Sequence, residues 1–154
     1  MSGARLTAAA LGAALLLAPL ASAAQSVAPC GDGPRIDTIA EPWKANTATY
    51  AGGEVRITLI DTAEPAAAAV HLAVIAPPRD ELGLRRCRLV SLSPGSGFYD
   101  LDFAARQASY DPARGLVLTL PAQLYVPETG EGRPASLTVT VNQQSGEVTA
   151  ALGP

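Results

Sequence analysis

The residues whose types and spacing are best suited to chemistry lie in one short stretch, residues 92–103, which reads LSPGSGFYDLDF. It combines a glycine-rich turn with two aspartates, Asp100 and Asp102, one residue apart. A calcium ion needs about six oxygen ligands, and two aspartates on one strand provide two or three. The glycines also lack the following helix that a phosphate-binding loop requires. The stretch therefore predicts a turn that leads into a strand, and a weak calcium site is the alternative.

In such a strand, alternate side chains point to opposite faces of the sheet. We expect one face to belong to the core, and it carries Tyr99, Leu101 and Phe103. The other face carries Phe98 and the two aspartates, whose carboxylates then point to solvent.

The single histidine, His71, invites a hydrolase interpretation, because serines lie in residues 91–96 and several aspartates are available. However, no serine stands in a G-x-S-x-G motif, and a histidine within an apolar strand is more often a packed residue. The sequence therefore favours a non-catalytic protein. The enzymatic alternative is a small hydrolase or carbohydrate-active enzyme that uses Asp100, Asp102 or Asp111 together with His71.

Cys30 and Cys87 are the two cysteines of the chain. In an exported protein such a pair is expected to form a disulfide. Closing a loop of that length stabilises the fold by about 4 kcal/mol in the chain-entropy model. A metal site would need clustered cysteine and histidine ligands, and a catalytic thiol would need a neighbouring base, so both alternatives are weak.

Two further features are candidates for surface binding. Arg85, Arg86 and Arg88 form the one local excess of positive charge. On a strand, Arg86 and Arg88 would share a face and could bind a carboxylate or phosphate, although a solvated strand face is the simpler interpretation. The single tryptophan, Trp43, either anchors a partner or fills one end of the core.

The N-terminus has the pattern of a secretory signal peptide. A short basic segment ends at Arg5, and an apolar run of 15 residues, from 6 to 20, is followed by small residues. That run is shorter than the ~20 residues that a membrane-spanning helix needs. We expect residues 1–23 to be removed by cleavage after Ala23 or Ala24. The mature chain would then be periplasmic or secreted and would have no membrane-spanning segment.

About 130 residues remain after cleavage, which is the size of one ordinary domain. Without Arg5, 10 basic and 14 acidic residues give a net charge of about −4. This mild acidity gives no reason to expect a nucleic acid or an anionic membrane as a partner. No metal-binding or cofactor motif is recognisable, so we expect neither a metal nor a cofactor.

From residue 47 onward the chain shows the period-two alternation of β-strands. The strongest examples are residues 116–126, 136–141 and 148–152, while Gly52-Gly53 suits a tight hairpin. About eight strands at a spacing of roughly ten residues predict an antiparallel β-sandwich of immunoglobulin-like type, with a small β-barrel as second choice.

Other segments should interrupt the strands. We expect residues 24–46 to be irregular and tied down by the disulfide, and residues 47–154 to form the sandwich domain. Pro77-Pro78 should end a strand because proline cannot donate to a β-ladder. Residues 127–134, PETGEGRP, should form a polar connector.

These features predict a small exported domain of bacterial type. We expect it to act as a non-enzymatic binding or assembly module, with a protein or glycan of the cell envelope as partner. Besides the enzymatic alternative, an exposed loop such as residues 127–134 could inhibit a peptidase.

Overall fold

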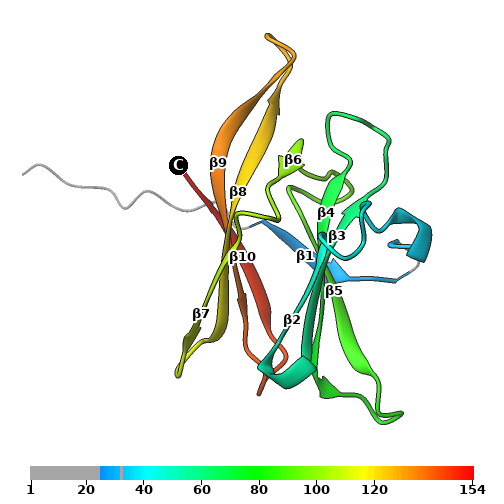
Figure 1. Ribbon diagram of the computed structural model, residues 1–154, viewed down its shortest axis with the longest axis vertical. Helices are drawn as coiled ribbons and strands as arrows, with labels where there is room; N and C mark the ends of the chain where they lie inside the picture. Colours follow the sequence, from blue (N-terminus) through cyan, green and yellow to red (C-terminus); the bar gives the residue numbers. More distant parts are fainter. Residues whose placement is uncertain (1–24, 32) are drawn as a thin grey trace, which may run out of the picture.

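The computed structural model describes residues 25–31 and 33–154, so the expected signal peptide lies outside the described residues. The described chain folds into two antiparallel sheets of five strands each, which face one another across a shared apolar core (Figure 1). This arrangement confirms the predicted β-sandwich. The described residues form no closed barrel.

Sheet 1 contains the N-terminal strands. Their spatial order is β1 (Ser26–Pro29), β5 (Arg85–Ser91), β4 (Val70–Arg79), β3 (Val55–Asp61) and β2 (Thr47–Tyr50). Two short 3-10 turns, η1 (Ile36–Thr38) and η2 (Ala51–Gly53), precede and follow β2.

Sheet 2 contains the C-terminal strands. Their order is β10 (Val148–Gly153), β9 (Glu131–Val141), β8 (Gly115–Val126) and then, both paired with β8, β6 (Asp100–Leu101) and β7 (Gln107–Asp111). The described residues thus form ten strands instead of about eight, and β1 lies in the segment that was expected to be irregular.

The core lies between the sheets and is built by the alternation that the sequence predicted. The fully buried aliphatic side chains come from both sheets: Val55, Ile57, Leu72, Val74, Val90, Leu118, Leu120, Leu137, Val139 and Val141. Burying each such side chain contributes about 1.5–3 kcal/mol relative to exposure. The period of two therefore fixes which face of each strand meets the other sheet.

Phe98 corrects the expected strand at residues 98–103. Its side chain is completely buried in the core, although the alternation placed it on the solvent face. The reason is that Phe98 pairs with Val70 of sheet 1, and the chain bonds to β8 of sheet 2 only after Phe98, beginning with the Tyr99 N–H. A single continuous strand, which the alternation assumed, does not exist there. Leu101 and Phe103 are buried as expected.

Proline positions supply two more corrections. Pro77-Pro78 lies inside β4, where the pairing with β5 shifts register between Ala76 and Arg79. At such a bulge the regular hydrogen bonding between the strands is interrupted, so prolines without an N–H can be accommodated. The second half of the expected connector at 127–134 is strand, because β9 begins at Glu131 and contains Pro134. β10 pairs with β9 only from residue 136 onward, so Pro134 lies where β9 has a neighbour on one side.

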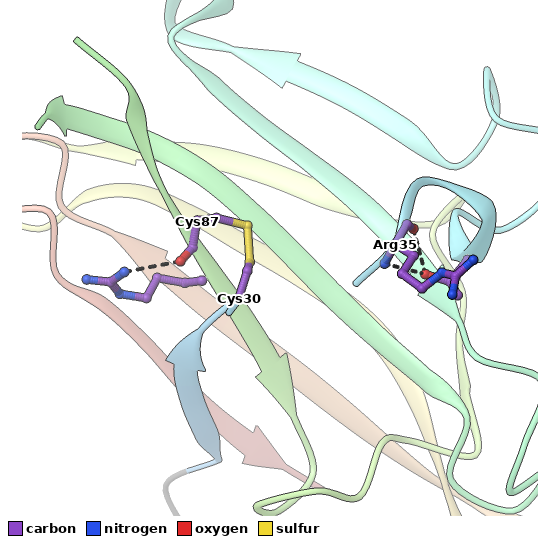
Figure 2. The surroundings of a disulfide bond; sticks show 5 residues. Cys30, Arg35 and Cys87 are labelled. Carbon is purple, nitrogen blue, oxygen red and sulfur yellow. Dashed lines mark hydrogen bonds between the residues drawn. A yellow bond between two sulfur atoms is a disulfide. The ribbon is translucent and has the colours of Figure 1, made fainter. Parts of the chain in front are cut away.

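The N-terminal segment is more ordered than expected and connects the two sheets. The backbone N–H of Gln25 donates to the carbonyl of Ala150 in β10, and β1 then joins β5 of sheet 1. The Cys30–Cys87 disulfide, with a Cα–Cα distance of 5.4 Å, confirms the predicted bridge and ties the end of β1 to β5 (Figure 2). The following residues cover the outer face of sheet 1, where Ile39 pairs with Ile60.

Arg106 connects the sheets on the opposite side of the sandwich. Its Nε donates to the Tyr50 hydroxyl of β2 over 3.1 Å, and its Nη1 donates to the Phe103 carbonyl over 2.6 Å. Its guanidinium also lies 4.2 Å from the centre of the Phe103 ring. Arg106, at the edge of sheet 2, therefore links that sheet to β2, the edge strand of sheet 1.

Candidate functional site

The most exposed large apolar side chain of the described residues, Leu82, lies at the tip of the β4–β5 hairpin. Leu82 is 84% exposed and Leu84 is 61% exposed. The hairpin projects from the lower end of sheet 1 in Figure 1. We call residues 79–85 the leucine turn. Two exposed leucines so close together form an apolar tip that is available for contact with another molecule.

The leucine turn is held in one shape by its own hydrogen bonds. Asp80 Oδ1 accepts from the backbone N–H of Leu82 over 2.9 Å and of Leu84 over 2.8 Å. The backbone of Asp80 bonds to Leu84 and Gly83, and Gly83 takes the positive φ of +82° that glycine tolerates. The backbone of the turn is thereby fixed by internal hydrogen bonds, and the two leucines project from it.

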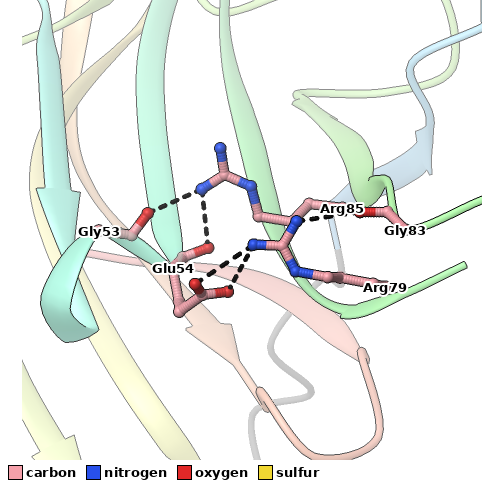
Figure 3. Close-up of polar contacts among 5 residues, drawn as sticks. All are labelled: Gly53, Glu54, Arg79, Gly83 and Arg85. Carbon is pink, nitrogen blue, oxygen red and sulfur yellow. Dashed lines mark hydrogen bonds and ion pairs between the residues drawn. The ribbon is translucent and has the colours of Figure 1, made fainter.

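Two arginines at the base of the turn fix it to the neighbouring hairpin (Figure 3). Arg79 donates to both carboxylate oxygens of Glu54 over 3.3 Å, and to the Gly83 carbonyl over 2.9 Å. Arg85 donates to the carbonyl of Gly53 over 2.7 Å and to that of Glu54 over 3.2 Å. The turn is therefore braced against the β2–β3 connection rather than standing alone.

The other arginines of the predicted cluster are placed differently. Arg86 and Arg88 lie opposite Ala76 and Val74 of β4, so they share one face of β5 as expected. Arg88 donates to the carbonyl of Cys87 over 3.1 Å. Among the described residues neither Arg86 nor Arg88 forms an ion pair, and no acidic group meets both.

Trp43 is 47% exposed and is not one of the core residues. It lies in the turn before β2, where its backbone N–H donates to the Glu41 carboxylate over 3.3 Å. Of the two roles considered for the tryptophan, filling the core is thus not what its position supports.

The two aspartates of the glycine-rich stretch are exposed, as expected from the strand pattern. Asp102 Oδ1 accepts from the backbone N–H of Ala105 over 3.0 Å and so closes a turn. Both carboxylates border a cavity of about 480 Å³ that also has Asn46 and Gln123 in its wall. Within the described part of the chain, no three histidine, cysteine or acidic side chains gather as a metal site.

His71 is brought together with Ser91 rather than with an aspartate. Its Nδ1 lies 2.8 Å from the Ser91 hydroxyl, and both residues are buried. Burial lowers the pKa of His71 below its usual value because the charged form loses solvation. A nucleophile and a base at this distance could in principle react. Here, however, Gly97 packs so closely that an added Cβ would lie 2.9 Å from His71 Nε2, which leaves no room for a substrate.

Asp111, the third aspartate of the hydrolase alternative, serves the β7–β8 turn. Its Oδ1 accepts from the backbone N–H groups of Ala113 and Arg114, and these bonds lower its carboxyl pKa. His71, Asp102 and Asp111 are therefore each engaged in a separate structural contact.

The leucine turn was not recognised from the sequence. The signal was present in the spacing of Asp80 and Gly83, because an aspartate three residues before a glycine often closes a tight turn. What the sequence does not reveal is that both leucines point away from the core.

None of the described segments forms a helix long and apolar enough to cross a membrane. Comparison with protein families, with curated proteins and with solved structures found no match for this chain.

Proposed function

We propose that this protein is an exported, non-catalytic binding module that docks onto another protein through the leucine turn. The observation that carries the proposal is the combination of exposure and rigidity at Leu82 and Leu84. A backbone that is already ordered loses little conformational entropy on binding, and apolar side chains gain by leaving water.

The chemistry of the tip favours a protein over a glycan or a charged membrane. The leucines present no hydrogen-bonding groups, which recognition of a glycan would need. Asp80 and Glu81 offset the adjacent arginines, so the turn has no net positive charge to attract anionic lipid. An apolar pocket large enough for a leucine side chain is the complementary surface.

Export is supported by the leader pattern of residues 1–23 and by the Cys30–Cys87 disulfide. Disulfides persist in oxidising compartments. We place the mature protein in the periplasm or outside the cell.

The test begins with a photoreactive amino acid in place of Leu82, in the organism that makes the protein. As a control, the same group replaces Ile36, which is 73% exposed but lies in η1, outside the leucine turn. We expect one discrete protein adduct from position 82 and none from position 36. Equal labelling from both positions, or no adduct from either, would contradict the proposal.

The partner identified in this way is then purified and its affinity measured. Leu82→Ala should weaken binding about thirtyfold, as expected for a buried anchor residue. Asp80→Ala keeps both leucines but removes the side-chain bonds that order the turn, so it should weaken binding by a smaller factor. Ile36→Ala should leave the affinity unchanged.

A further inference from the structure

β7 has an open edge that the other edge strands do not have. Within the described residues it pairs only with β8, and four of its five residues are exposed. Its sequence, QASYD, contains neither proline nor lysine, the residues that commonly prevent edge strands from pairing. The free backbone groups along this edge can therefore accept another strand.

The remaining edges are blocked or short. At β10, the backbone of Gln25 donates to Ala150 and its side chain accepts from the N–H of Leu152. β1 ends in Pro29, β6 has two residues, and β2 has four that are mostly half-buried. The contrast singles out β7 as the strand on which pairing between molecules would occur.

The inner face of β7 is also uncovered. Ala108 and Tyr110 lie opposite Leu118 and Leu116 of β8, so they belong to the face that elsewhere packs in the core. Tyr110 is nevertheless 66% exposed. An apolar cavity of about 550 Å³, bordered by Tyr110 and by Tyr50 of β2, lies beside it, and its lining contains no charged side chain.

We propose that β7 pairs antiparallel with β7 of a second copy of this chain, about a two-fold axis at Ser109. In that register Ala108 lies opposite Tyr110 of the second copy, and each Tyr110 gains an apolar neighbour on the inner face. Cross-strand aromatic pairs of this kind stabilise sheets.

The charges of β7 are compatible with this pairing. Gln107 lies opposite Asp111 of the second copy, so an amide faces each carboxylate. The two Asp111 residues lie at opposite ends of the paired strands, about 14 Å apart, because antiparallel strands rise ~3.4 Å per residue. That separation exceeds the screening length of ~8 Å at physiological ionic strength, so repulsion between them is small.

The interface is small, and the association should therefore be weak. Five residues of strand edge bury less than the roughly 800 Å² per partner of a stable complex. We expect a reversible dimer that is populated only at high protein concentration.

Sedimentation velocity of the mature protein from about 10 µM to about 1 mM tests the proposal, because this range brackets weak dissociation constants. Two double variants distinguish self-pairing of β7 from any other association. In Ala108→Lys/Tyr110→Lys each new cation faces a new cation of the second copy. In Ala108→Lys/Tyr110→Glu each new cation faces a new carboxylate. Both variants lose the same tyrosine, and circular dichroism verifies that both remain folded.

We expect the wild type to dimerise, and the lysine–lysine variant to dimerise at least tenfold more weakly than the lysine–glutamate variant. Thr49→Lys, on the exposed part of the β2 edge, should dimerise like the wild type. A wild type that stays monomeric throughout would overturn the proposal. Equal association of the two double variants would also overturn it, because the register requires positions 108 and 110 to face one another.

Discussion

At the scale of single residues, the burial of His71 beside Ser91 makes stability depend on pH. Burial lowers the His71 pKa in the folded state, whereas the unfolded chain keeps an ordinary value of about 6.5. As the pH falls, the unfolded chain takes up the proton first, and the folded state is therefore disfavoured. The contribution is fully present above about pH 7 and is lost as the pH falls below 6.5 toward the folded pKa.

We therefore expect the urea midpoint of the wild type to decrease between about pH 7.5 and pH 5, a range above the usual titration of carboxylates. His71→Gln cannot titrate and should lose that part of the decrease. An identical decrease in both proteins would show that other groups cause it.

Gly97 shows how closely the chain crosses between the sheets. A Cβ at this position would lie 2.5 Å from the carbonyl oxygens of both Ala68 and Val70. These oxygens accept hydrogen bonds from Gly97 and Phe98, so they cannot move aside freely. Gly97→Ala should cost about 1–3 kcal/mol of unfolding free energy by overpacking.

Gly153→Ala is the matched control, because the nearest atom to its new Cβ lies 3.9 Å away. It should change stability by no more than about 0.5 kcal/mol. Thermal or urea unfolding of the two variants side by side decides whether the crowding at residue 97 has the stated cost.

At the scale of the elements, the disulfide attaches β1 to β5 across a sequence separation of 57 residues. Its removal in Cys30→Ser/Cys87→Ser should lower the unfolding free energy by about 4 kcal/mol, because the unfolded chain regains that loop entropy. For a domain of this size the melting temperature should fall by roughly 10–15 °C. Calorimetry with and without reductant measures the loss. The reductant should destabilise the wild type and leave the double variant unaffected.

The sequence predicts an element well where neighbouring strands enforce the same alternation. β8, β9 and β10 follow their patterns closely because one face of each is buried in the shared core. Phe98 could not be assigned to the core from the sequence, because its burial depends on pairing with Val70, which is distant in the sequence. Pro134 was wrongly taken as part of a connector for a related reason. Proline lacks an N–H, and this excludes it from a strand only where a neighbouring strand needs that donor.

Less of the candidate site than of the fold could be predicted from the sequence. The disulfide followed from the presence of two cysteines in a chain with an expected export signal, and the exposure of Asp100 and Asp102 followed from alternation. The leucine turn was missed, because the same leucine spacing would serve in a buried hairpin. Only the path of β4 and β5 beyond the edge of the core exposes Leu82 and Leu84.

At the scale of the whole molecule, Arg106 joins the edges of the two sheets. Arg106→Ala removes a hydrogen bond to Tyr50 and the contact with the Phe103 ring, and it should cost about 2 kcal/mol of unfolding free energy.

A double-mutant cycle with Tyr50→Phe isolates the bond between the sheets. We expect a coupling of about 1 kcal/mol between the two positions, measured by urea unfolding of the wild type and the three variants. Additive effects would mean that Arg106 acts through Phe103 alone.

The bond between Gln25 and Ala150 has a consequence for how the molecule is assembled. A chain that is synthesised or threaded through a pore from its N-terminus delivers Gln25 long before Ala150. β5, which pairs with β1, is also synthesised much later than β1. Cys30 therefore remains a free thiol until Cys87 has been made. The contact between Gln25 and β10 can form only when this last strand is available, so the two sheets become joined at this end late in folding.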